Sequence, residues 1–181
     1  MSLIAGNLAV VQRLLDSANL PWGVFAGAAA HLYGNRRPIQ DVDLVVPKGQ
    51  LSTVVQLLKT SGKAVQFDGQ RILWRGIEIF DDLSVRQVGR TYPLLLDAPM
   101  QAHLRRISLL GARVAVVAPE DVVAHKLLLG RGVAEGKHDE DDVAGVIRRQ
   151  QLDLDYLRER ARLLNAESLL RGKLAALEVT I

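Results

Sequence analysis

The 181-residue sequence contains no cysteine. This absence excludes disulfide bonds, thiolate zinc sites, iron–sulfur clusters and cysteine nucleophiles. Any metal ion must therefore be bound by oxygen or imidazole ligands. The sequence also lacks an apolar run of the roughly 18–20 residues that a membrane-spanning helix needs, and it has no secretory leader, so we expect a cytoplasmic protein with no membrane partner.

Aromatic residues are scarce, at 4% of the chain, and the formal net charge is only +3. Proteins that bind single-stranded nucleic acid typically combine stacking rings with a basic stripe. The composition therefore gives little support to nucleic-acid binding. A basic groove remains open as an alternative, built by Arg71, Arg75, Arg105, Arg106 and Arg113.

Hydropathy and turn signals predict an α+β chain whose last third is entirely helical. We expect helices over residues 2–18, 28–33, 51–58 and 100–110, and strands over 22–26, 42–46, 64–67, 71–80 and 113–117. Four more helices are expected over 120–130, 139–150, 153–164 and 166–177. This pattern divides the chain into an α/β core over 1–118 and a C-terminal helical subdomain over 119–181.

Two aspartates interrupt an otherwise apolar strand, in the segment Asp41-Val42-Asp43-Leu44-Val45-Val46. Side chains at positions i and i+2 of a strand leave the same face, with Cα atoms roughly 6.5–7 Å apart. Asp41 and Asp43 can therefore converge on one or two metal ions. Simple solvation at a strand edge is the alternative for an isolated pair of this kind.

The segment upstream offers groups that suit a phosphate. Gly27 stands where a strand gives way to a helix, and the first amides of a helix are free to bind an anion. Arg36 and Arg37 follow in a polar loop, close enough to contact a polyphosphate or to offset the charge of the aspartates. A turn glycine and a solvated loop are the alternatives when each feature is considered alone.

In this order, the segment from Gly27 to Gly34, Arg37, and the segment from Asp41 to Val46 resemble the signature of the nucleotidyltransferase superfamily, which has the DNA polymerase β-like catalytic fold. The resemblance is closest to small bacterial members, including the abortive-infection toxin type. It implies a small mixed sheet with flanking helices, followed by a helical bundle. It also implies that Gly27, Ala28, Arg36, Arg37 and Lys126 bind a nucleoside triphosphate.

The resemblance further implies that Asp41 and Asp43 bind Mg²⁺ or Mn²⁺, with a third carboxylate from a neighbouring strand. Glu78, flanked by apolar residues in Gly76-Ile77-Glu78-Ile79-Phe80, matches that third position, and Asp81 and Asp82 compete with it. The segments 118–126 and 137–143 resemble the helical half of the family. In that half, Lys126 would face the cleft and the later acidic residues would position two helices.

The predicted function is metal-dependent transfer of a nucleoside monophosphate to a hydroxyl of tRNA, protein or a small molecule. Glu78 stands where an aspartate is commoner in the family. Two further residues depart from the family pattern: Ala28 replaces a glycine or serine, and Ile39 replaces a threonine. These departures favour one alternative, a non-catalytic relative that binds a nucleotide or a protein. A second alternative is the toxin of a toxin–antitoxin pair, with an antitoxin as partner.

Overall fold

The computed structural model describes residues 3–87 and 89–181. Its helices are α1 (Leu3–Ser17), α2 (Ala26–Tyr33), α3 (Leu51–Lys59), α4 (Ala98–Ala102), α5 (Pro119–Leu129), α6 (Asp139–Arg149), α7 (Leu154–Leu163) and α8 (Glu167–Ala175), with a 3-10 turn η1 at Val133–Glu135. Its strands are β1 (Gly23–Phe25), β2 (Val42–Val45), β3 (Gln66–Phe67), β4 (Arg71–Trp74), β5 (Ile77–Phe80), β6 (Val85–Gln87), β7 (Arg90–Tyr92), β8 (Arg105–Leu109) and β9 (Ala112–Val116).

The chain up to Val116 builds a mixed sheet with strand order β3-β4-β5-β2-β1-β9-β8, and β6 pairs with β7 in a separate small sheet. The parallel pairs are β2 with β5 and β1 with β9, and the other pairs are antiparallel. The α+β architecture with flanking helices is thus confirmed. The parallel pairing of β2 and β5 matters most for the site, because it sets the segment of Asp43 beside that of Glu78.

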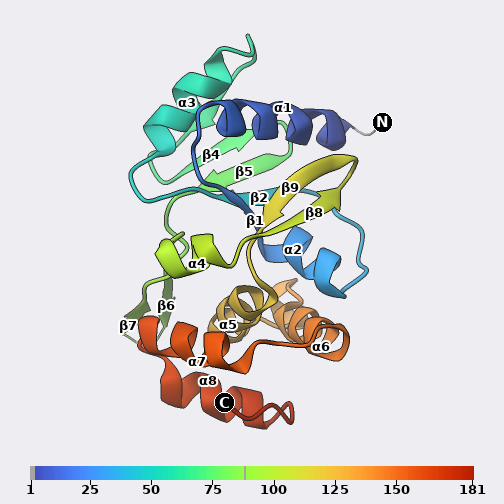
Figure 1. Ribbon diagram of the computed structural model, residues 1–181, viewed down its shortest axis with the longest axis vertical. Helices are drawn as coiled ribbons and strands as arrows, with labels where there is room; N and C mark the ends of the chain where they lie inside the picture. Colours follow the sequence, from blue (N-terminus) through green and yellow to red (C-terminus); the bar gives the residue numbers. More distant parts are fainter. Residues whose placement is uncertain (1–2, 88) are drawn as a thin grey trace.

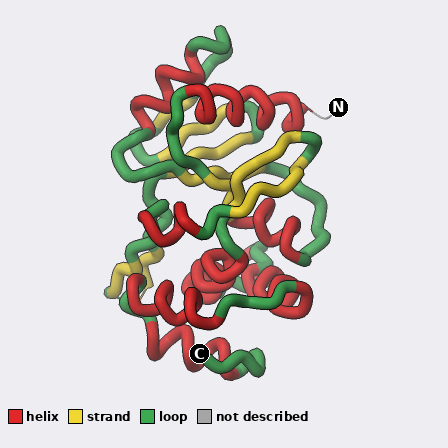
Figure 2. The backbone as a smooth tube through the Cα atoms, viewed as in Figure 1, coloured by secondary structure: helices red, strands yellow, loops and turns green. Residues whose placement is uncertain are grey.

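Helices α1 and α3 pack together over one face of the sheet and contact β4, β5 and β9 (Figure 1). The helical half gathers around α5, which contacts α2, α6, α7 and α8. In Figure 2 the strands of the large sheet lie in the upper part of the molecule and the helices from α5 onward lie below. Because α5 is surrounded, its residues from Pro119 to Leu128 are all buried. No helix in residues 3–87 and 89–181 is both long and apolar enough to cross a membrane.

Two expectations about local structure are wrong. The segment 71–80 is two strands, β4 and β5, because Arg75 and Gly76 take φ values of +55° and +84° and form a tight hairpin turn. The helix expected over 100–110 ends after α4, and β8 follows it. Leu110 and Gly111, with φ of +51° and +85°, then reverse the chain into β9. Paired positive φ values are typical of the two-residue turns that match the twist of a hairpin.

Candidate active site

A row of register partners runs across the sheet from β1, near its centre, to β3 at its edge. Asp43 on β2 pairs with Phe25 on β1 and with Glu78 on β5, and the row continues through Leu73 on β4 to Gln66 on β3. Side chains at paired positions leave the sheet on the same face. Asp43 and Glu78 are therefore neighbours on adjacent strands, which is the position that the resemblance implied for a third carboxylate.

Asp41 and Asp43 open into one cavity of about 470 Å³. Asp43 lies within β2, whereas Asp41 lies one residue before its first residue, Val42. The other residues that line this cavity, called here the nucleotide cavity, are Ala26, Gly27, Ala28, Asn35, Arg37, Pro38, Ile39, Gln40, Lys126, Arg131, Gly136, Lys137, His138, Asp139 and Asp142. Most of the residues proposed from the sequence therefore meet in one place.

Glu78 lines the adjoining cavity instead. This second cavity, called here the hairpin cavity, has a volume of about 380 Å³ and shares Asp41 with the nucleotide cavity. One oxygen of the Glu78 carboxylate accepts a hydrogen bond from Arg71 at 3.1 Å. Asp41, Asp43 and Glu78 thus stand along the boundary between two cavities.

The negative charge at this boundary is only partly compensated. Burial, followed by the charges of Asp41 and Glu78, raises the pKa of Asp43 to about 7, while the charges of Lys126 and Lys137 act in the opposite direction. A carboxyl group in such surroundings binds a cation favourably, because the cation removes the repulsion between like charges.

The chemistry of these residues fits a hard divalent cation. Carboxylate oxygens are the protein ligands that Mg²⁺ prefers, usually one or two of them together with substrate phosphates and water. Among the described residues, no three His, Cys, Asp or Glu side chains are already gathered closely enough to hold an ion without a substrate. The arrangement therefore suits an ion that arrives with a polyphosphate.

The N-terminus of α2 borders the nucleotide cavity. Ala26 begins the helix with φ of +51°, a left-handed conformation that side chains rarely adopt, and Gly27 follows it. A Cβ atom added to Gly27 would meet no heavy atom within 4 Å, so the backbone there faces open space. The first amides of a helix have no partner within it and favour an anion.

Two buried aspartates of α6 organise the cations on the opposite wall. The ammonium of Lys126 lies 2.9 Å from Asp139 and 2.7 Å from Asp142. Arg37 donates to Asp142 at 2.6 Å, and Arg131 donates to Asp139 at 2.8 Å. Lys126 therefore does face the cavity, as expected, with much of its charge already compensated.

Asp142 also accepts a hydrogen bond from Asn35, in the loop after α2. A Cβ atom on Gly34 would lie 2.4 Å from the carbonyl oxygen of Gly145 on α6, and Gly34 has φ of +150°. This close approach presses the loop that carries Arg37 against α6. The resemblance implied that the later acidic residues position two helices, and Asp142 also holds the loop that carries Arg37.

Lys137 was not among the residues proposed from the sequence as binding groups. It lines the nucleotide cavity and is exposed. Among the cavity lysines and arginines that the structure describes, Arg37, Lys126 and Arg131 each have a carboxylate within ion-pair distance, and no such pair is found for Lys137. The glycines at 130, 132 and 136 were the sequence signal for a loop here.

Three other sequence candidates lie elsewhere. Arg36 is exposed and does not line the nucleotide cavity. Asp81 accepts a hydrogen bond from the amide of Gly49 at 2.7 Å, and Asp82 pairs with Lys48. Both aspartates therefore stabilise the loop after β2, which leaves Glu78 as the carboxylate beside Asp43.

The five arginines considered for a basic groove do not form one. Arg71 and Arg75 belong to the β4–β5 hairpin, while Arg105, Arg106 and Arg113 belong to β8 and β9 at the other edge of the sheet. Several of them also pair with carboxylates, including Arg71 with Glu78 and Arg106 with Asp16. This arrangement removes the main argument for a nucleic-acid groove.

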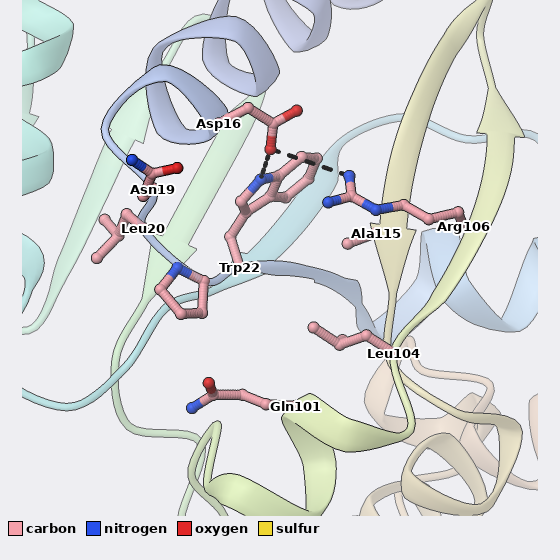
Figure 3. Close-up of a pocket in the computed structure, with 9 residues that line it drawn as sticks. Asp16, Asn19, Leu20, Trp22, Gln101, Leu104, Arg106 and Ala115 are labelled. Carbon is pink, nitrogen blue, oxygen red and sulfur yellow. Dashed lines mark hydrogen bonds and ion pairs between the residues drawn. The ribbon is translucent and has the colours of Figure 1, made fainter.

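A further cavity, of about 500 Å³, lies at the N-terminal end of β1, whereas Gly27 follows the C-terminal end of that strand. Figure 3 shows the Asp16 carboxylate between the indole of Trp22, which donates to it at 2.8 Å, and the guanidinium of Arg106, 3.9 Å away. None of the proposed catalytic or nucleotide-binding residues lines it. We therefore place the candidate site at Asp41, Asp43 and Glu78.

Comparisons with known proteins bear on this site. A family model described as "uncharacterised nucleotidyltransferase" matches residues 2–178. None of the curated proteins matches the sequence.

The solved structures that share the fold include the following three. The crystal structure of ANT(2'')-Ia in complex with adenylyl-2''-tobramycin has a TM-score of 0.53 at 14% identity and covers 97% of this chain and 98% of its own. The lincosamide antibiotic adenylyltransferase LnuA, bound to lincomycin, has a TM-score of 0.50 at 16% identity and covers 80% and 97%. An antigenic nucleotidyltransferase-like protein from Paracoccidioides brasiliensis has a TM-score of 0.50 at 20% identity and covers 99% and 94%.

Proposed function

The chain belongs to the family of uncharacterised nucleotidyltransferases, and from this premise we propose that it transfers a nucleoside monophosphate from a nucleoside triphosphate to a hydroxyl group, with Mg²⁺ or Mn²⁺ as cofactor. One observation carries the proposal. Asp43 and Glu78 are register partners on adjacent strands, at the boundary between a cavity rich in cations and a second cavity that shares Asp41. A transferase needs this arrangement, because its two substrates must meet at the catalytic groups.

The nucleotide cavity suits the triphosphate. Backbone amides of Gly27 and Ala28 at the start of α2 would donate to phosphate oxygens. Lys137, for which no carboxylate partner is found among the described residues, would add a positive charge. Arg37 and Lys126, fixed by Asp142, would complete the positive wall. Arg36 is left out of this proposal because it lies away from the cavity.

Asp41 and Asp43 would hold the metal ion together with the phosphates. When it is bound, the ion supplies positive charge that offsets the charge developing on the phosphate oxygens. Glu78 would accept the proton of the acceptor hydroxyl, and Arg71 keeps that carboxylate in place. The acceptor oxygen forms a bond to the α-phosphorus, the bond between the α-phosphorus and the bridging oxygen breaks, and pyrophosphate leaves with that oxygen.

Two alternatives stay predictions of the sequence. A non-catalytic relative would bind the nucleotide without transferring it, in keeping with Ala28 and Ile39. A toxin acting with an antitoxin partner would use the same chemistry, so the site does not distinguish it from other transferases.

The proposal is tested by incubating the protein with each α-³²P-labelled nucleoside triphosphate, Mg²⁺ or Mn²⁺, and a cell extract. We expect label on an acceptor, and we expect Asp41→Asn/Asp43→Asn to abolish it while the protein stays folded. Nucleotide binding without any transfer of label would favour the non-catalytic alternative.

A further inference from the structure

The hairpin cavity has a composition different from that of the nucleotide cavity. It is lined by Asp41, Ala64, Gln66, Leu73, Trp74, Arg75, Gly76, Ile77 and Glu78. Arg75 is the only cation among them, and its Nε atom donates to Asn7 of α1 at 3.3 Å. Two carboxylates, one of which accepts a hydrogen bond from Arg71, and one tethered guanidinium make a less favourable environment for a polyphosphate than the nucleotide cavity, which four lysines and arginines line. The two cavities are therefore suited to different ligands.

The position of Glu78 relates the hairpin cavity to the transfer reaction. Glu78 faces this cavity, its register partner Asp43 faces the nucleotide cavity, and Asp41 lines both. A molecule in the hairpin cavity would approach the phosphates from the side on which Glu78 stands. That is the side from which an acceptor hydroxyl must come if Glu78 takes its proton.

The sheet leaves room for such a molecule because its helices cover this face unevenly. Over β1, the ring of His125 on α5 packs against Phe25, with ring centroids 4.6 Å apart. Farther along the same row, Gln66 is exposed and Leu73 and Glu78 are only half-buried. Over β3, β4 and β5 the face is therefore open to solvent, with an apolar floor at Leu73 and an amide at Gln66.

We propose that the hairpin cavity is the acceptor site, and that the acceptor is a small hydroxylated compound, neutral or cationic, with an apolar face. This inference rests on the proposed function. A volume of about 380 Å³ lies within the range of roughly 300–1,000 Å³ that is typical of small-molecule sites. The acidic boundary disfavours a polyanion such as tRNA.

The experiment uses a matched pair of substitutions in the intact protein. Gln66→Trp places a large ring in the hairpin cavity, and Gln70→Trp places the same ring in the exposed β3–β4 turn, outside that cavity. Ala64→Trp serves as a second blocking variant in case Gln66→Trp does not fold. Each protein is incubated with α-³²P-labelled triphosphates and Mg²⁺, in separate reactions with a low-molecular-weight filtrate of cell extract, bulk tRNA and the protein fraction.

We expect label in the filtrate reaction with the parent and Gln70→Trp, and at least a tenfold loss with a folded blocking variant. The affinity for Mg²⁺–ATP should stay within twofold in all of these proteins. Label only on tRNA or protein, no label in the filtrate, or full activity in the blocking variants would overturn the inference. A parent that binds no nucleoside triphosphate would instead contradict the proposed function itself.

Discussion

Asp43 on β2 and Glu78 on β5 are register partners in neighbouring parallel strands. Their side chains leave the same face, from backbones about 4.8 Å apart. Asp41 adds a third carboxylate at the same boundary. The fold thus holds like charges together, which costs stability unless a cation is present.

Asp43→Asn should stabilise the metal-free protein at pH 8, by up to about 1 kcal/mol, the scale of a like-charge pair directly opposite in a sheet. The amide keeps the shape of the carboxylate and removes the buried charge. Urea denaturation in the presence of a chelator measures the free energy of unfolding. A clear loss of stability would mean that the Asp43 carboxylate has a structural role.

Lys137→Ala should weaken the binding of Mg²⁺–ATP by about tenfold, or about 1.4 kcal/mol, as expected for the loss of one charged contact to a phosphate. The loss of affinity caused by Lys137→Ala should be smaller for AMP than for Mg²⁺–ATP, and Lys137→Arg should restore most of the affinity. Arg36→Ala is the matched control, because it removes the same charge outside the nucleotide cavity. Isothermal titration calorimetry would refute the role of Lys137 if both alanine variants bound ATP equally well.

Asp142→Asn should destabilise the protein by about 2–3 kcal/mol. This buried carboxylate accepts a hydrogen bond from Asn35 and forms ion pairs with Arg37 and Lys126. Thermal unfolding measures the loss. Asp141→Asn is the control: Asp141 is exposed and pairs with His138 at 3.3 Å, so its effect should be within about 0.5 kcal/mol. Equal effects of the two substitutions would show that Asp142 does not organise this wall.

His125 should make the protein sensitive to acid. Burial, followed by the charge of Lys126, lowers the pKa of His125 to about 3, while in the unfolded chain it is near 6.5. Between these values the unfolded state binds a proton that the folded state does not, so stability falls as pH decreases from about 6.5.

His125→Phe keeps a ring beside Phe25 and removes this titration. As pH decreases, the free energy of unfolding should therefore fall less steeply in the variant than in the parent. The two slopes should differ by at most about 1.4 kcal/mol per pH unit. Denaturation curves between pH 4.5 and 7.5 provide the comparison. Parallel pH profiles for the two proteins would show that His125 becomes protonated in the folded state.

The sequence predicted the helical half well, because its amphipathic periods and the Pro119 start signal are local features. It missed the β4–β5 and β8–β9 hairpins for a local reason as well. Arg75 and Leu110 occupy turn positions with positive φ that more often hold Asn, Asp or Gly. Only the following glycine marked each turn, so β5 was not separated from β4 and β8 was taken for helix.

The candidate site was also predictable only where local sequence signals mark it. The spacing of Asp41 and Asp43 brought two carboxylates together, and the apolar flanks of Glu78 indicated a strand. That β5 lies parallel to β2, rather than elsewhere in the sheet, depends on long-range pairing that no local pattern encodes. The pairing of Lys126 with two aspartates on α6, and the free position of Lys137, likewise depend on the packing of separate helices.

The most direct test of the account is the thermal unfolding of the parent and of Asp41→Asn/Asp43→Asn with ATP, with and without Mg²⁺. A ligand that binds only the folded state raises the unfolding temperature, by about 5–10 °C for a chain of this size near 100 times Kd. We predict this rise for the parent with Mg²⁺ and ATP together, and its loss in the double variant. An equal rise in both proteins would contradict the claim that these carboxylates bind a metal–nucleotide complex.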